Sequence, residues 1–123
     1  MIVEKSKILI IDDEEDICFV LNHYLNDKAH KVSYALSLKA GILKLKELRP
    51  EILFLDISLP DGSGLNSIKK IKKSCPEIKI AIISAYDSQE DLSKAMDAGA
   101  DAYITKPFSR TIILKTIEDF LME

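Results

Sequence analysis

The sequence has few of the features that mark several common classes of protein. Its 123 residues include two cysteines, Cys18 and Cys75, which lack the close pairing of a zinc or thiol-redox motif, so we expect reduced thiols. Its 17 basic residues are outnumbered by 20 acidic ones, which argues against nucleic-acid binding by this segment. No apolar run approaches the roughly 20 residues of a membrane span, and no secretory signal opens the chain. These absences favour a cytoplasmic protein that does not bind membranes.

Length and composition fit one folded domain. A 47% hydrophobic content in 123 residues is enough to build one substantial core. The sequence has no internal repeat, low-complexity tract or visible linker. We interpret residues 1–6 as an N-terminal lead-in and residues 7–121 as a single domain.

Strand-like and helix-like segments alternate five times along the chain. The strand-like segments are residues 7–11, 31–35, 52–55, 80–83 and 102–104. This alternation predicts an α/β fold, in which helices cover both faces of a parallel sheet through right-handed crossovers.

Polar residues mark the ends of the predicted helices. Ser37 and Ser109 are placed to cap the second and fifth helices. Residues 87–90 fit a capping box for the fourth helix, in which Met96 is predicted to point inward. Gly99 suits the C-terminal cap of that helix.

Five polar residues follow the ends of predicted strands: Asp12, Asp13, Asp56, Ser84 and Lys106. In open parallel sheets the ligand crevice lies beyond the carboxyl ends of the strands, at the point where the strand order switches. We therefore expect these groups to meet at one edge of the sheet.

Each of these residues also has a simpler interpretation when taken alone. The acidic pair would stabilise a helix N-terminus, Ser84 would be an ordinary loop serine, and Lys106 would be a surface lysine. Tyr103 would be a strand aromatic packed against a helix. Their joint occurrence at successive strand ends favours a shared site.

As a set, the motifs resemble the receiver domain of bacterial two-component response regulators. The resemblance runs from about Lys7 to Leu121. It implies a flavodoxin-like, doubly wound, five-stranded parallel sheet of order 2-1-3-4-5 with five helices, the order of a chemotaxis receiver. The segments that carry it are Asp12-Asp13, Asp56, Leu59-Pro60-Asp61-Gly62, Ser84-Ala85, Tyr103 and Lys106-Pro107.

The resemblance implies a role for each matching residue. Asp56 would accept the phosphoryl group. Mg²⁺ would be held by the carboxylates of Asp12, Asp13 and Asp56 and by the backbone carbonyl of Ser58. Lys106 would pair with the phosphoryl group.

Further roles concern catalysis and switching. By the same resemblance, the Ser84 hydroxyl and the Ala85 backbone N–H would contact the phosphoryl group, with Ser84 and Tyr103 acting as switch residues. The bond between Lys106 and Pro107 is a plausible cis peptide, although only about 5–6% of such bonds are cis in folded proteins.

The chemistry is consistent with these roles. An aspartate is ionised at neutral pH, so Asp56 needs no neighbouring base in order to attack phosphorus. Neighbouring carboxylates repel one another, and a hard divalent ion such as Mg²⁺ relieves that repulsion.

The function predicted from the sequence is a switch that a histidine kinase or phosphotransfer protein phosphorylates. It would act on no substrate but itself, and would control a downstream effector through the face formed by the fourth helix, fifth strand and fifth helix, with a homodimer as a further option. One alternative is a receiver-like interaction module that works without phosphorylation. A flavodoxin-type redox protein is disfavoured because residues 12–16 are acidic and would repel a flavin phosphate.

Overall fold

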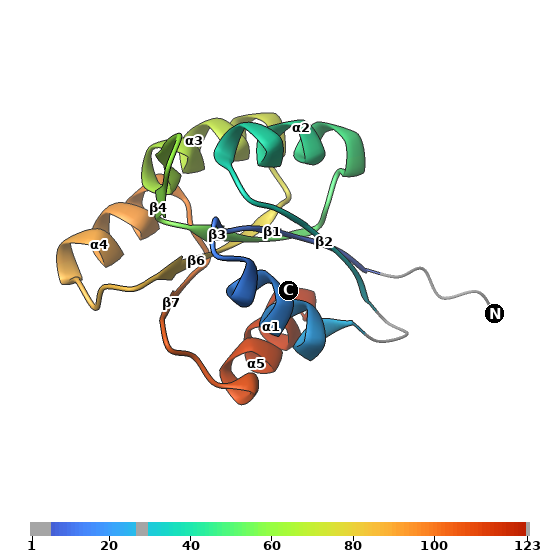
Figure 1. Ribbon diagram of the computed structural model, residues 1–123. Helices are drawn as coiled ribbons and strands as arrows, with labels where there is room; N and C mark the ends of the chain where they lie inside the picture. The colour runs from blue at the N-terminus through green and yellow to red at the C-terminus, as the bar shows by residue number, and fades with distance from the viewer. Residues whose placement is uncertain (1–5, 27–29, 123) are drawn as a thin grey trace.

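The computed structural model of the chain describes residues 6–26 and 30–122 and has a layered α/β architecture (Figure 1). The strands are β1 (Ser6–Ile11), β2 (His30–Ala35), β3 (Ile52–Asp56), β4 (Ser58–Leu59), β5 (Gly62–Ser63), β6 (Lys79–Ser84) and β7 (Ala102–Thr105). The helices are α1 (Glu15–Leu25), α2 (Leu38–Leu48), α3 (Gly64–Ser74), α4 (Gln89–Ala98) and α5 (Arg110–Leu121).

Five of the strands form one parallel sheet in the order β2-β1-β3-β6-β7. The short strands β4 and β5 pair with each other in a separate antiparallel ribbon, which the sequence did not predict. When this ribbon is set aside, the order is 2-1-3-4-5. The flavodoxin-like fold is therefore confirmed.

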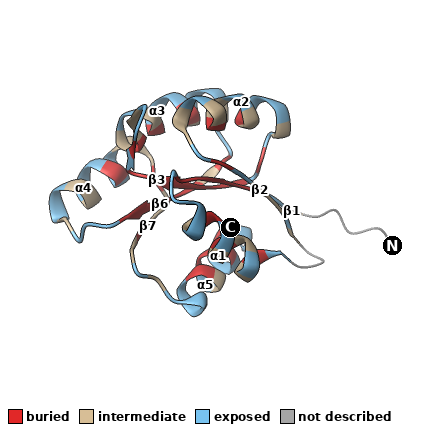
Figure 2. Ribbon diagram, viewed as in Figure 1, coloured by how far each residue is buried: buried red, intermediate tan, exposed pale blue. Residues whose placement is uncertain are grey.

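Helices cover both faces of the sheet. Figure 1 shows α2 and α3 on one side, with α4 next to α3, and α1 and α5 on the other. Side chains of β1, β3 and β6 alternate between two hydrophobic cores, one under each helix layer, and Figure 2 shows these central strands as buried. All five residues of β3 are buried. Strands covered on both faces need apolar side chains in both directions, which explains the unbroken apolar runs of the sequence.

The helix ends follow the predicted capping pattern at three positions. Ser37 Oγ accepts a hydrogen bond from the Ala40 N–H, and Ser109 Oγ accepts one from the Ile112 N–H. Gly99 has a φ of 114° and ends α4 in the left-handed conformation that favours glycine.

Two predictions about α4 are wrong. The N-cap is Ser88, whose Oγ accepts a hydrogen bond from the Asp91 N–H, so the cap lies one residue later than a capping box begun at Asp87. Met96 is 44% exposed, because the neighbouring Ala95 occupies the inward position of the helix.

The ends of the predicted domain can be compared with the described residues. Ser6, which we assigned to the lead-in, is the first residue of β1 and pairs with His30. Residues 1–5 lie outside the described part of the chain. No helix among the described residues is both long and apolar enough to cross a membrane.

Candidate functional site

Three of the predicted site residues extend one row of side chains on the sheet. Asp12 follows β1, Asp56 ends β3 and Lys106 follows β7. Because side chains alternate across a strand, each is expected on the same face as the residue two positions earlier. Those earlier residues are buried in the core that faces α1 and α5: Ile10, Phe54 and Ile104. The strands thus deliver the three charged groups to one edge of one face.

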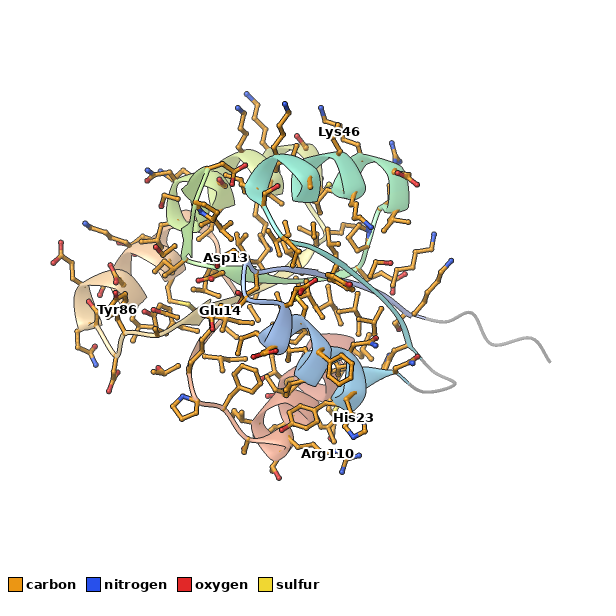
Figure 3. All side chains as sticks on the ribbon, in the orientation of Figure 1. Asp13, Glu14, His23, Lys46, Tyr86 and Arg110 are labelled. Atoms are coloured by element: carbon orange, nitrogen blue, oxygen red, sulfur yellow. The ribbon has the colours of Figure 1, made fainter. Side chains whose placement is uncertain are left out.

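Asp12, Asp13 and Asp56 form a carboxylate cluster. One oxygen from each residue lies within 4.8 Å of the others. Asp12 is fully buried and Asp56 is 5% exposed, whereas Asp13 is exposed. Figure 3 shows Asp13 at the turn between β1 and α1. The cluster therefore has a buried floor and one carboxylate open to solvent.

Lys106 reaches this cluster across the sheet edge. Its Nζ lies 3.0 Å from Asp12 Oδ2, 3.0 Å from Glu14 Oε1 and 3.6 Å from Asp56 Oδ2. The side chain is only 11% exposed. The peptide bond between Lys106 and Pro107 is cis, as predicted.

Burial and charge shift the pKa values of this site. Burial raises the pKa of Asp56 to about 6; the Asp12 carboxylate adds to the rise, while the Ser58 N–H and Lys106 oppose it. Burial lowers the pKa of Lys106, but the contacts with Asp12 and Glu14 outweigh burial and raise it above its ordinary value. Lys106 is therefore a permanent cation beside a carboxylate that resists ionisation.

Asp12 is held by its backbone and by one of its two carboxylate oxygens. Its N–H donates to the Ala35 carbonyl over 3.1 Å, and its Oδ1 accepts a hydrogen bond of 2.9 Å from the Glu14 N–H. Its backbone carbonyl accepts from Cys18 Sγ at 3.4 Å. Oδ2 is buried and has no hydrogen-bond partner among the described residues; its ion pair with Lys106 is the contact found there.

The cluster fits a hard divalent cation. A buried carboxylate is costly unless cations compensate its charge, and here the single Lys106 ammonium is shared among Asp12, Asp56 and Glu14, which leaves part of the negative charge uncompensated. Mg²⁺ is bound through oxygen ligands, commonly one or two carboxylates with water. Asp12, Asp13 and Asp56 supply only oxygen. The Ser58 carbonyl as a further ligand stays a prediction.

The segment after β3 is fixed from two sides. The Ser58 N–H donates to Asp56 Oδ1 over 3.1 Å and so orients that carboxylate. Asp61 bridges the segment to α2, because its two carboxylate oxygens accept the N–H groups of Leu38 and Lys39. These backbone bonds, that of Lys39 foremost, lower the pKa of Asp61. Asp61 belongs to the motif Leu59-Pro60-Asp61-Gly62, but this bridging role was not predicted from the sequence.

Gly64 allows α3 to begin directly against the site. A Cβ at this position would lie 2.2 Å from the backbone oxygen of Asp56, a distance that no side chain tolerates. The Gly64 N–H also donates to the Ile57 carbonyl over 3.0 Å. Glycine is therefore required here for close approach of two backbone segments.

Ser84 and Tyr103 are connected through the backbone of Tyr86. Ser84 is fully buried, and its Oγ accepts a hydrogen bond of 3.0 Å from the Tyr86 N–H. The Tyr103 hydroxyl donates to the Tyr86 carbonyl, also over 3.0 Å. Tyr103 is half-buried against the core beneath α3 and α4. Ala85 lies between Ser84 and Tyr86, and the role of its N–H stays a prediction.

The sequence was compared with known protein families to identify the one that combines this fold with this carboxylate cluster. The sequence pattern described as the response regulator receiver domain matches residues 8–118. The chain belongs to the response regulator receiver family. Receivers of two-component systems act in general as phosphorylation-dependent signalling switches that bind Mg²⁺ at an acidic pocket.

Individual relatives agree with this assignment. The receiver is 33% identical over 103 residues to the KDP operon transcriptional regulatory protein KdpE of Escherichia coli, covering 84% of this chain and 45% of that protein. It is 31% identical over 105 residues to the response regulator protein VraR of Staphylococcus aureus, covering 84% and 50%. The receiver thus spans about half the length of these curated relatives.

Solved structures show the same fold over nearly the whole chain. The BeF3-activated receiver domain of DrrB matches with a TM-score of 0.90 and 29% identity, covering 98% of this chain and 100% of that one. A CheY-like receiver domain protein from Methanospirillum hungatei matches with a TM-score of 0.91 and 30% identity, covering 97% and 95%.

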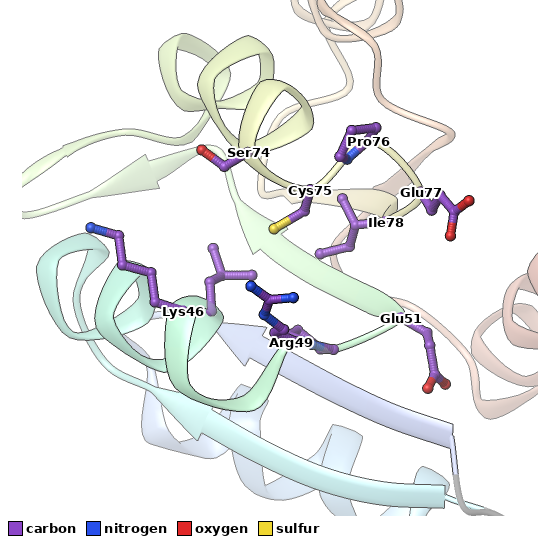
Figure 4. Close-up of a pocket in the computed structure, with 10 residues that line it drawn as sticks. Lys46, Arg49, Glu51, Ser74, Cys75, Pro76, Glu77 and Ile78 are labelled. Carbon is purple, nitrogen blue, oxygen red and sulfur yellow. The ribbon is translucent and has the colours of Figure 1, made fainter.

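A cavity of about 740 Å³ in this receiver lies away from the carboxylate cluster. It is formed where α2 and α3 end and β3 and β6 begin, as Figure 4 shows, and its lining includes Leu45, Arg49, Cys75 and Ile78. The carboxylates lie where the strands end, so this cavity belongs to the opposite edge of the sheet.

Proposed function

We propose that this receiver is a switch that accepts a phosphoryl group from a histidine kinase, or from a phosphotransfer protein, on Asp56. One observation carries the proposal: the Asp56 carboxylate lies close both to a carboxylate pair suited to Mg²⁺ and to the Lys106 ammonium. A phosphoryl group placed there would be near both cations. Phosphoryl transfer depends mainly on alignment and on neutralising charge on the equatorial oxygens.

The two oxygens of Asp56 have different surroundings, so they are not equivalent as nucleophiles. Oδ1 accepts a hydrogen bond from the Ser58 N–H, whereas Oδ2 lies 3.6 Å from Lys106 Nζ. In the reaction an Asp56 oxygen forms the new bond to phosphorus while the bond from phosphorus to the donor's histidine nitrogen breaks. Mg²⁺, when bound, neutralises phosphoryl oxygens and favours the ionised form of Asp56.

The protein would catalyse only reactions on itself. Lys106, the Ser84 hydroxyl and the Ala85 N–H are proposed to stabilise the phosphoryl oxygens during transfer from the donor and during slow hydrolysis by water. No histidine or serine nucleophile is needed, because a carboxylate is the acceptor. We therefore propose no enzymatic activity toward other substrates.

The change of state is proposed to travel from Ser84 to Tyr103. If the Ser84 hydroxyl turns toward a phosphoryl oxygen, the hydrogen bond that it accepts from Tyr86 is weakened or lost. The Tyr86 carbonyl, which holds the Tyr103 hydroxyl, moves with the same peptide segment. Phosphorylation thereby alters the face formed by α4, β7 and α5.

That face is the proposed contact for a downstream effector domain or protein, and for a homodimer if one forms. Several large apolar side chains on it or beside it are exposed: Tyr86, Met96 and Ile112. Exposed apolar groups of this kind favour a protein partner, and we propose no direct contact of this segment with nucleic acid or membrane. The location that fits this role is the cytoplasm.

Treatment with acetyl phosphate, with and without Mg²⁺, tests the proposal. We expect a mass increase of one phosphoryl group that requires Mg²⁺ and is absent in Asp56→Asn. An exposed neighbour of the cluster, Asp16→Asn, serves as the matched control and should be phosphorylated like wild type. Phosphorylation that persists in Asp56→Asn would place the acceptor elsewhere. Failure of wild type to react would favour the alternative of an interaction module that works without phosphorylation.

A further inference from the structure

Glu14 lies at the mouth of the carboxylate cluster and contacts Lys106, the cation that pairs with this cluster. It is the N-cap residue that precedes α1, but its side chain makes no capping hydrogen bond. The side chain turns instead to Lys106, whose Nζ donates to Glu14 Oε1 over 3.0 Å. Figure 3 shows Glu14 next to Asp13 at the start of α1. A residue that looks like part of an acidic helix cap is therefore paired with a predicted site residue 92 positions away.

The Lys106 ammonium is shared among three carboxylates of different burial. Asp12 and Asp56 are buried, whereas the Glu14 side chain is 58% exposed. Asp12 Oδ2, which Lys106 contacts, is also an oxygen suited to hold the metal ion. Asp56 is the proposed phosphoryl acceptor. Once metal and phosphoryl group are bound, Glu14 is the carboxylate left to compete with the phosphoryl group for Lys106.

We propose that Glu14 is a positioning residue that restrains Lys106 and so opposes the phosphorylated state. The inference rests on the proposed function of Asp56. Lys106 Nζ is 0.6 Å nearer to Glu14 than to Asp56, the difference between 3.6 and 3.0 Å. A phosphoryl group on Asp56 would compete with Glu14 for the ammonium, so pairing with it is expected to weaken the contact between Lys106 and Glu14. Glu14 also adds negative charge beside the entry path of an anionic phosphodonor, which slows its approach.

The expected size follows from the exposure of the pair. An ion pair with one exposed partner is screened by water and salt, so its loss changes an equilibrium by a factor of about two to five. Glu14→Gln should therefore bind a phosphoryl mimic about two- to fivefold more tightly than wild type. The gain should shrink at high salt.

Beryllofluoride binding at saturating Mg²⁺ is the test, because it measures an equilibrium at Asp56 without turnover. Glu15→Gln is the matched control: it removes the same charge from the next residue, which is also exposed and for which the structure shows no ion pair with Lys106. We expect tighter beryllofluoride binding and faster phosphorylation by acetyl phosphate in Glu14→Gln than in Glu15→Gln. In the metal-free proteins, the Nζ resonance of Lys106 should shift in Glu14→Gln and not in the control.

The outcomes separate this inference from the proposed function. Suppose that the wild type binds beryllofluoride but that Glu14→Gln binds it no more tightly than Glu15→Gln does. The restraint by Glu14 is then overturned, while the proposed function of Asp56 stands. An Nζ resonance that is unaffected by Glu14→Gln also overturns the restraint, because the ion pair is then absent in solution. If none of the three proteins binds beryllofluoride, the proposed function fails and this inference fails with it.

Discussion

At the scale of single residues, the site consists of charged side chains in buried positions, where an ionised group is costly in free energy. Asp12 and Asp56 are carried into the sheet edge by strands whose preceding residues are core side chains. Lys106 compensates them only in part, because one cation is shared among Asp12, Asp56 and Glu14. We therefore expect the metal-free protein to be less stable than a variant of the same fold that lacks these buried charges. The charges are kept because the proposed function requires them.

Asp56→Asn should stabilise the metal-free protein at pH 7. Burial raises the pKa of Asp56 to about 6 from the 3.8 of a free carboxyl, so the folded state retains a proton at pH values where the unfolded state has lost it. Stability is consequently lost as the pH rises from about 4 to above 6. Asparagine removes this loss, and after allowance for solvent screening we expect a gain of about 1–2 kcal/mol at pH 7.

Urea unfolding in the presence of a chelator, at several pH values, measures this gain. The advantage of Asp56→Asn should shrink as the pH falls toward 4 and disappear below it, where Asp56 of the wild type becomes protonated in both the folded and the unfolded state; it should also narrow when Mg²⁺ is added at pH 7. Asp16→Asn, which alters an exposed carboxylate of α1, should stay within about 0.5 kcal/mol of wild type. A wild-type protein that is as stable as Asp56→Asn at pH 7 without metal would contradict the costly burial of this charge.

At the scale of elements, β6 and β7 connect the site to the proposed partner face. Ser84 ends β6 and pairs in register with Thr105 of β7, while Ile82 pairs with Tyr103. Tyr86 lies two residues after the end of β6. Its backbone N–H donates a hydrogen bond to Ser84 Oγ, and its backbone carbonyl accepts one from the Tyr103 hydroxyl. Because the Tyr86 backbone is hydrogen-bonded to both proposed switch residues, the proposed signal requires no movement of either strand.

Ser84→Ala should uncouple Tyr103 from events at Asp56. Alanine lacks the oxygen that accepts the Tyr86 N–H and that is proposed to contact the phosphoryl group. At saturating beryllofluoride and Mg²⁺, the ring resonances of Tyr103 should shift in wild type and shift several-fold less in Ser84→Ala. Ser84→Thr keeps the hydroxyl and should restore the shift, and Ser93→Ala on the exposed side of α4 should behave as wild type. A full Tyr103 shift in Ser84→Ala would exclude this route.

At the scale of the whole molecule, the features that could be predicted from the sequence are those that leave a repeated pattern in it. The central strands β1, β3 and β6 could be predicted because burial on both faces makes each of them an apolar run, and the site could be predicted because polar residues follow the strand ends. The β4–β5 ribbon was not predicted, since strands of two residues have no periodicity. The pairing of Glu14 with Lys106 was not predicted either, because 92 residues separate the partners and the helix start already explained the acidic residue.

A second group of charged side chains lies at the end of the sheet opposite the site, where the strands begin. At the edge opposite the site, Lys72 of α3 donates to the Ile78 carbonyl over 2.6 Å and pairs with Asp101 at 2.8 Å. Asp101 Oδ2 also accepts the Ile80 N–H. These bonds join α3 to the starts of β6 and β7. Because both side chains are about one-quarter exposed and their bonds are satisfied, this cluster serves stability rather than chemistry.

Lys72→Met should therefore destabilise the receiver without altering its site. The substitution leaves the partly buried Asp101 without its cation and the Ile78 carbonyl without its donor, for which we expect a loss of about 1–3 kcal/mol in the free energy of unfolding. Lys73→Met, on an exposed position of the same helix, should cost far less, and adding Asp101→Asn to Lys72→Met should recover part of the loss. Beryllofluoride affinity should stay at the wild-type value in all three, because the carboxylate cluster lies at the other end of the strands. If Lys72→Met weakened beryllofluoride binding as strongly as it lowered stability, the two edges would be coupled, and the separation of stability from chemistry across this sheet would be wrong.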